Sequence, residues 1–297
     1  MTMKRTSLLL LAATITAGAA PFTYPPEMPG ARVESYQAAD GSSLSLFIFN
    51  PEGHRAADQR PAIVFFFGGG WTNGSPKQFE QQSRYLASRG MVAISADYRV
   101  ASRQKVKAVD CVADARAAVA WVRAHAAALG IDPARIAAGG GSAGGHIAAC
   151  TGVIAGEMGE RSVPNALVLF NPALVLAPLD GQVTKESITA ERVGVEPRAL
   201  SPVHHVKPGA PPTIVFHGKA DTTVPFVTAE AFAVAMQKAG NRCELAAFEG
   251  QKHGFFNFGR GDDTMARETL RQTDKFLVSL GWLSGEPAVD AFFGVKK

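Results

Sequence analysis

The sequence is poor in charged residues and in cysteines. Charged residues make up 19% of the 297 residues, which excludes a highly charged, disordered chain. Only three residues are cysteines, and none of them has the CxxC spacing of a redox or zinc site. Cys111 and Cys150 fall in apolar helical patterns, where a buried free thiol is the simplest interpretation. One disulfide among Cys111, Cys150 and Cys243 stays open, because the sequence does not choose a pair.

Basic clusters and metal-ligand spacings are absent from the sequence as well. No run of lysine and arginine indicates a face that binds nucleic acid, although the formal net charge is +4. No HExxH or comparable spacing of histidine and carboxylate residues occurs. We therefore expect no nucleic-acid partner and no metal site.

The chain begins with a segment that is typical of a secretory signal peptide. Lys4 and Arg5 form a short basic region, an apolar run begins at Leu8, and residues 17–19 have the small side chains of a cleavage site. The apolar run is too short for a stable membrane span, and no nearby cysteine indicates a lipid anchor. The sequence therefore predicts cleavage after Ala19 and export to the periplasm or the extracellular space. We expect no stable membrane span after the signal is removed.

After residue 60, short apolar runs alternate with longer helical patterns, in a chain that is 46% hydrophobic. A continuous apolar run such as 62–67 is typical of a buried parallel strand. The other predicted strands are 91–96, 135–138, 166–170, 213–216 and 243–248. The predicted helices are 76–89, 108–129, 143–156, 227–239 and 264–280. This alternation predicts one α/β domain over residues 20–297, whose mostly parallel sheet has helices on both faces.

Two segments depart from this alternation. Residues 31–50 contain two short strand patterns around Ala39, Asp40 and Gly41, which predicts a hairpin at an antiparallel edge of the sheet. Residues 172–211 are rich in proline and only weakly periodic. We expect them to form a small, irregular cap or long loop above the sheet.

Residues 140–144 match the pattern G-x-S-x-G, with Ser142 at its centre. The pattern follows a predicted strand and precedes a predicted helix, as in a nucleophile elbow, where small neighbours permit a tight turn that projects the hydroxyl. The helix N-terminus favours the negative charge that develops there. Since glycine-rich turns match this pattern by chance, its place between strand and helix carries the prediction that Ser142 is a nucleophile.

A serine hydroxyl needs a general base, and the base needs an acid that orients it. Asp221 lies just after the predicted strand 213–216, and His253 lies just after the predicted strand 243–248. Active sites of open α/β sheets lie at the carboxyl ends of their strands. The chain order serine, aspartate, histidine therefore predicts a catalytic triad of Ser142, Asp221 and His253.

Other residues compete for these roles. Glu249 is an alternative acid, but it lies only four residues before His253 and would have to fold back on its own loop. His217 could be the base only if the chain order were broken. His146 follows the elbow on the same predicted helix, where a structural hydrogen bond is the simpler interpretation. The histidine pair 204–205 indicates packing or a surface position.

Three consecutive glycines follow the first central strand, at residues 68–70. Glycines allow backbone N–H groups to approach a substrate oxygen and point at it. We expect an oxyanion hole formed by the backbone N–H groups of Gly69, Gly70 and Ala143. An ordinary flexible loop is the alternative interpretation.

Taken together, these residues resemble the α/β-hydrolase superfamily of serine esterases. The likeness is greatest to hormone-sensitive-lipase-like esterases and to acetyl xylan and feruloyl esterases. It covers about residues 60–282 and rests on the segments 67–71, 97–99 and 141–146, together with Asp221 and His253. In such families a histidine usually precedes the first glycine, whereas this chain has Phe67, which leaves the backbone donors in place. The resemblance gives Asp97 and Arg99 structural roles.

The resemblance also implies a reaction, a two-step hydrolysis of carboxylic esters that needs no cofactor. His253 would take the proton of Ser142, and Asp221 would orient the imidazole and stabilise its charged form. The implied substrates are short-chain esters, either small molecules or the acetyl and feruloyl esters of plant polysaccharide. Export fits a polymer too large to enter the cell.

Two other functions stay open on the sequence. Prolyl-oligopeptidase-like serine peptidases have the same triad order, but this chain has no room for their propeller domain. A non-catalytic binding protein with a hydrolase fold is the second alternative. Such proteins usually lose a triad residue, whereas all three candidates are present here.

Overall fold

The computed structural model describes residues 24–179 and 188–295. The predicted signal peptide, residues 1–19, lies outside the described residues, so export remains a prediction. Residues 180–187 of the predicted cap lie outside them too. No helix in the described ranges is long and apolar enough to cross a membrane.

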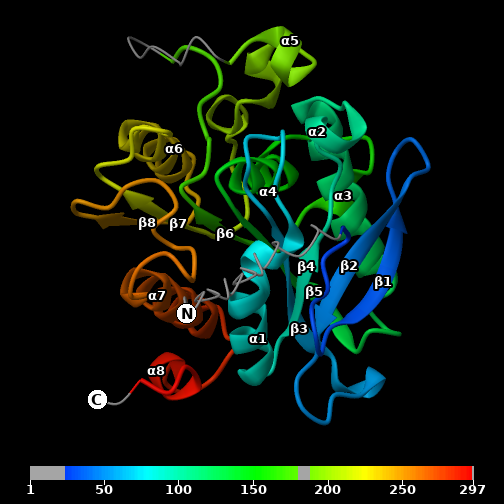
Figure 1. Cartoon of the computed structure of the whole chain (residues 1–297). Coiled ribbons are helices and arrows are strands. Elements are labelled where there is room, and N and C mark those ends of the chain that lie inside the picture. The colour runs from blue at the N-terminus through cyan, green and yellow to red at the C-terminus, as the bar shows by residue number, and fades with distance from the viewer. Residues whose placement is uncertain (1–23, 180–187, 296–297) are drawn as a thin grey trace, which may run out of the picture.

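An eight-stranded sheet runs through the described part of the chain (Figure 1), in the order β1-β2-β4-β3-β5-β6-β7-β8. The first two strands form the predicted hairpin and pair antiparallel, as β2 and β4 also do, whereas every other neighbouring pair is parallel. The strands are β1 (Arg32–Gln37), β2 (Ser43–Phe49), β3 (Arg60–Phe66), β4 (Val92–Ala96), β5 (Ile131–Gly141), β6 (Ala166–Phe170), β7 (Thr213–Gly218) and β8 (Cys243–Phe248).

Helices cover both faces of this sheet (Figure 1). Alternate residues of β3 enter two different cores, with Val64 and Phe66 packed on one face and Ile63 and Phe65 on the other. The first core includes residues of α3 (Ala108–Ala124), α4 (Ala143–Val153) and α6 (Phe226–Lys238). The second includes residues of α1 (Glu80–Ser88) and α7 (Thr264–Ser279). Burial on both faces explains why the central strands are continuously apolar.

Short helical elements complete the described chain. The short α-helices are α2 (Ala101–Gln104), α5 (Ala190–Val193) and α8 (Val289–Phe292). The 3₁₀ turns are η1 (Ala56–Asp58), η2 (Pro76–Phe79), η3 (Gly159–Ser162), η4 (Pro197–Leu200) and η5 (Pro202–His205). The described part of the predicted cap thus consists of single helical turns, α5, η4 and η5, joined by irregular chain.

Two expectations about boundaries and cysteines have clear outcomes. The predicted helix 108–129 ends earlier, at Ala124, because the backbone leaves helical geometry at His125, with φ −100° and ψ 10°. Further on, His54 and the backbone N–H of Arg60 bind the carbonyl oxygens of Leu129 and Gly130. All three cysteines are buried and free, so the structure contains no disulfide between them.

Because β3, β5, β7 and β8 are parallel, their carboxyl ends share one edge of the sheet.

Candidate active site

Ser142 occupies a strained turn between β5 and α4. Its φ of 53° lies in the left-handed region that non-glycine residues rarely adopt. The turn packs directly against the end of β3, since a Cβ atom added to Gly144 would lie 2.1 Å from the carbonyl oxygen of Phe66. The backbone N–H of Ser142 donates to the carbonyl oxygen of Phe170 at 2.8 Å. Glycine beside the serine is therefore a steric requirement of this elbow.

The structure brings Ser142, His253 and Asp221 into one hydrogen-bonded chain. Nε2 of His253 lies 2.9 Å from Oγ of Ser142. Nδ1 of His253 lies 2.7 Å from Oδ2 of Asp221, within the distance that the sequence led us to expect. Three loops at the carboxyl ends of β5, β7 and β8 supply these side chains. The arrangement has the geometry of a nucleophile, a general base and an orienting acid.

The carboxylate of Asp221 is held ionised by its surroundings. Its Oδ1 accepts the backbone N–H groups of Thr223 and Val224, both at 2.8 Å, and Asn171 donates to Oδ2 at 2.9 Å. Burial alone would raise the pKa of this carboxyl, but hydrogen bonds from His217, His253 and Val224 hold it well below the usual range. An ionised Asp221 can stabilise a positive charge on His253.

The side chains that compete for the triad roles make other contacts. The Glu249 side chain is 80% exposed and pairs with Lys219 at 2.5 Å, so it does not meet His253. His217 contacts Asp221 at 3.4 Å and donates to the carbonyl oxygen of Val224, without a bond to Ser142. The pair 204–205 binds Ser201 and the carbonyl oxygen of Arg198, within the described part of the cap.

The glycine loop after β3 lies against the elbow. A Cβ atom added to Gly68 would lie 3.2 Å from Cβ of Ser142. Gly69 has a φ of 130°, and a Cβ atom there would lie 2.2 Å from the carbonyl oxygen of Asn73. The N–H groups of Gly69 and Gly70 donate no hydrogen bond within the residues that the structure describes. Ala143 is the first residue of α4, so its N–H has no partner within the helix. The predicted donors Gly69 and Gly70 thus have free N–H groups within the described chain and line the same hollow as Ser142, which Ala143 directly follows.

Aromatic and polar contacts brace this loop where related families usually have a histidine. The ring of Phe67 stacks on the ring of Tyr98, with 4.1 Å between the ring centroids, and the Tyr98 hydroxyl donates to the Phe67 carbonyl oxygen at 2.6 Å. Oε1 of Gln78 accepts the N–H of Gly68 at 2.6 Å, and Arg103 donates to the carbonyl oxygen of Gly74. Phe67 therefore supports the loop by packing instead of by a side-chain hydrogen bond.

Asp97 and Arg99 have structural contacts, as the resemblance implied. Arg99 forms a buried ion pair with Asp114 at 2.7 Å and reaches Asp40 in the hairpin. Asp97 accepts the backbone N–H of Tyr98 at 2.8 Å. Both residues tie the end of β4 to its neighbours without contacting Ser142.

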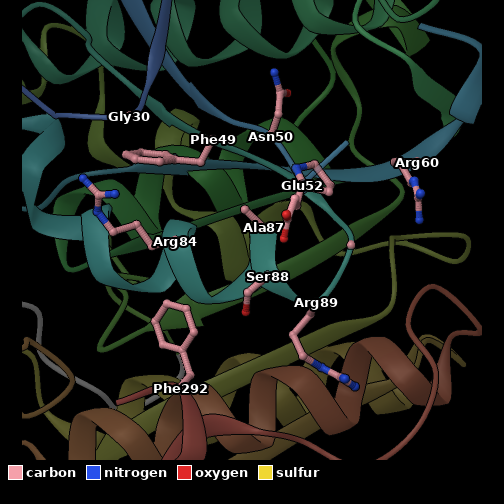
Figure 2. A pocket seen from close by; sticks show the side chains of 12 residues that line it. Gly30, Phe49, Asn50, Glu52, Arg60, Arg84, Ala87, Ser88, Arg89 and Phe292 are labelled. Carbon is pink, nitrogen blue, oxygen red and sulfur yellow. The ribbon is translucent and has the colours of Figure 1, made fainter. Parts of the chain in front are cut away.

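A hollow of about 510 Å³ opens at Ser142. Its lining residues are Gly68, Gly69, Gly70, Asn73, Gly74, Ser75, Gln78, Ser142, Thr223, His253, Gly254, Phe256, Asn257 and Arg260. A second hollow of about 590 Å³, shown in Figure 2, lies beside Phe49, the end of α1 and Phe292. The three arginines there are already paired, Arg60 with Asp58, Arg84 with Glu80 and Arg89 with Asp274. Of these two hollows, the first contains two members of the candidate triad, Ser142 and His253.

His146 links the glycine loop, α4 and the cap. Its Nε2–H donates to the carbonyl oxygen of Leu200 at 2.7 Å, and its Nδ1 accepts the indole N–H of Trp71 at 3.2 Å. The sequence predicted a structural hydrogen bond here but not the partners, which are 54 and 75 residues away. Burial lowers the pKa of His146 from 6.5 to about 4, so the imidazole is neutral near pH 7.

We expect His146 to make the fold sensitive to acid. Below pH 6.5 the unfolded chain takes up a proton that the folded protein resists until about pH 4, so stability falls across this window. The His146→Gln variant keeps an acceptor and a donor but does not titrate. Between pH 7.5 and pH 4.5 the wild type should lose about 2–3 kcal/mol more of its free energy of unfolding than the variant does. Urea titrations at both pH values measure this difference, and equal losses would contradict it.

The sequence reasoning missed Asn171, Gln78 and Asn257. Asn171 directly follows β6 at the carboxyl edge of the sheet, which is the signal that led to Asp221, so it could have been found. Gln78 binds Asn257 at 2.8 Å across 179 residues of chain, and no local pattern indicates that pairing.

Comparison with known proteins gives consistent results. A sequence model of the family described as "alpha/beta hydrolase fold" matches residues 63–257. The chain is 32% identical over 219 residues to the esterase LipC of Mycobacterium tuberculosis, a match covering 66% of this chain and 53% of LipC. It is 27% identical over 221 residues to a probable isoprenylcysteine alpha-carbonyl methylesterase, ICMEL1, of Arabidopsis thaliana, covering 65% of this chain and 45% of that protein. The chain thus spans about half the length of these two curated relatives.

A solved structure is more similar over a longer stretch. It is the thermophilic esterase Est2 of the planctomycete Thermogutta terrifontis with propionate bound. The sequences are 55% identical, the TM-score is 0.83, and the match covers 89% of this chain and 100% of that one.

Proposed function

Since the chain belongs to the alpha/beta hydrolase fold family, we propose that it is a serine carboxylesterase that hydrolyses short-chain esters. One observation carries this proposal, namely the chain from Asp221 through His253 to Ser142, with contacts of 2.7 Å and 2.9 Å. The similarity to LipC and to Est2 supports an esterase activity. Structures of Est2 hold propionate and butyrate, which supports a preference for short acyl groups.

The proposed reaction proceeds in two steps. Nε2 of His253 takes the proton of Ser142 as Oγ attacks the ester carbonyl carbon, and the negative oxygen is stabilised by the N–H groups of Gly69, Gly70 and Ala143. The imidazolium then protonates the leaving alcohol, and an acyl group remains on Oγ. Water, deprotonated by His253, attacks the acyl carbonyl, and the acid leaves as Ser142 regains its proton. Asp221 keeps the imidazole oriented through both steps.

The acyl preference is tested with p-nitrophenyl esters of rising chain length. We expect kcat/KM to be largest for acyl chains of a few carbons and to fall about tenfold or more for long chains, because the structures of the similar esterase Est2 hold propionate and butyrate. Acetylated xylan and a chromogenic prolyl peptide, assayed beside these esters, test the polysaccharide and peptidase alternatives. Cleavage of the peptide in preference to every ester would contradict the proposal. A folded protein that cleaves none of these substrates would favour the non-catalytic alternative.

A further inference from the structure

The hollow at Ser142 contains one permanently charged side chain, Arg260. Its other lining residues are neutral, apart from the histidine of the candidate triad. The guanidinium lies against the loop that carries His253, since a Cβ atom added to Gly254, the next residue, would lie 3.1 Å from Nη1 of Arg260. A positive charge therefore lies in the wall of the hollow that contains Ser142 and His253.

Arg260 makes no ion pair and no hydrogen bond with any part of the chain that the structure describes. Other arginines of this protein are committed to carboxylates, as Arg84 is to Glu80 and Arg99 to Asp114. An unpaired, exposed arginine is ordinary on a protein surface. Its position in the wall of the hollow is what distinguishes Arg260.

The polar groups next to Arg260 are already used. Oε1 of Gln78 accepts the N–H of Gly68, and Nε2 of Gln78 donates to Oδ1 of Asn257 at 2.8 Å. Nδ2 of Asn257 donates to the carbonyl oxygen of Gly254 at 2.8 Å. Gln78 and Asn257 are thus bonded to the protein itself, whereas the guanidinium of Arg260 can still donate hydrogen bonds to a ligand.

The charges around the mouth favour an anion. A neighbouring hollow shares Gln78, Asn257 and Arg260 with the first, and adds Lys77, Glu80 and Asp263. Glu80 is paired with Arg84, and Asp263 accepts the N–H of Gly259 but keeps its negative charge, which the two cations Lys77 and Arg260 outnumber. Lys77 forms no ion pair within the described ranges. The carboxylate that binds His253, Asp221, is buried.

We propose that Arg260 binds an anionic group of the ester, so that the substrate class is esters that carry a carboxylate or a similar anion. A planar guanidinium matches a carboxylate with two parallel hydrogen bonds, and its charge also attracts an anionic ester from solution. This inference rests on the proposed esterase function.

Two matched pairs of esters test the proposal. Mono-p-nitrophenyl adipate and p-nitrophenyl 6-oxoheptanoate differ only in a carboxylate on the acyl side. The pair of 4-acetoxybenzoate and 4-acetoxybenzamide differs in a carboxylate on the alcohol side. The readout is the ratio of kcat/KM for the anionic ester to that for its neutral partner. For at least one pair we expect the wild type to favour the anionic ester, and Arg260→Gln to lower that ratio about tenfold.

Lys77→Gln is the matched control, because Lys77 lines only the neighbouring hollow. It removes the same charge and should change the ratio less than about twofold. Arg260→Lys keeps the charge without the planar fork and should give an intermediate ratio. Ratios near one in the wild type for both pairs, or equal effects of Arg260→Gln and Lys77→Gln, would overturn the anion site while leaving the esterase intact. If the wild type hydrolyses none of the four esters, the proposed function is overturned, and the inference with it.

Discussion

Replacing Ser142 by alanine should leave a folded protein whose kcat/KM for a short-chain ester is lower on the order of 10⁴-fold or more. Oγ of Ser142 is the atom that His253 contacts at 2.9 Å, and no acyl-enzyme can form without it. Serine already carries a Cβ atom at its φ of 53°, so alanine introduces no new clash in the elbow. Initial rates of p-nitrophenyl ester hydrolysis measure the loss, and circular dichroism checks the fold.

Ser75→Ala provides a matched control for this variant. Ser75 lines the same hollow, but its Oγ accepts the backbone N–H of Lys77 instead of contacting His253. Its replacement removes a helix cap and should cost less than about tenfold in kcat/KM. Turnover by folded Ser142→Ala at a rate near that of Ser75→Ala would remove Ser142 from the mechanism.

Asp221→Asn should lower kcat by up to about 10⁴-fold while the protein stays folded. The backbone N–H groups of Thr223 and Val224 would hold the amide oxygen in the place of Oδ1. The amide NH₂ would then face Nδ1 of His253, which favours the tautomer that carries its proton on Nε2 and cannot accept the proton of Ser142. The charge that stabilises the imidazolium is lost as well.

Glu249→Gln is the comparison that separates the two candidate acids. Glu249 is exposed and pairs with Lys219, so its loss should change kcat less than about twofold. Parallel rate measurements on the two purified variants decide the matter. A large loss in Glu249→Gln with near-normal turnover in Asp221→Asn would reverse the assignment of the acid and leave Ser142 as the nucleophile.

The sheet and the meeting of the three candidate triad residues could be predicted, because their signals in the sequence are local. Buried parallel strands are continuously apolar, and polar residues directly after them mark the edge where sites form. Ser142 lies in a tight turn that requires glycines nearby, which gives a recognisable local pattern. The chain order serine, aspartate, histidine then points to Asp221 and His253.

The supporting contacts could not be predicted, because they join segments that only packing brings together. His146 meets Trp71 and Leu200, and Gln78 meets Asn257, across long stretches of sequence. Both Asp221 and Glu249 follow strands near the site, so only the three-dimensional structure shows that Asp221 contacts His253 and that Glu249 pairs with Lys219 instead. The end of the helix predicted at 108–129 was wrong, because the chain leaves helical geometry at His125 and residues 129–130 instead bond to His54 and Arg60, which are distant in sequence.

The claim that Ser142 is the nucleophile is tested most directly by covalent labelling. The protein is incubated with paraoxon, an organophosphate that traps activated serines, and the modified residue is mapped by mass spectrometry of the digested protein. We expect one diethylphosphoryl group on Oγ of Ser142, formed in step with the loss of esterase activity, and no label in Ser142→Ala. Complete loss of activity with the label on another residue, and Ser142 unmodified, would contradict the account.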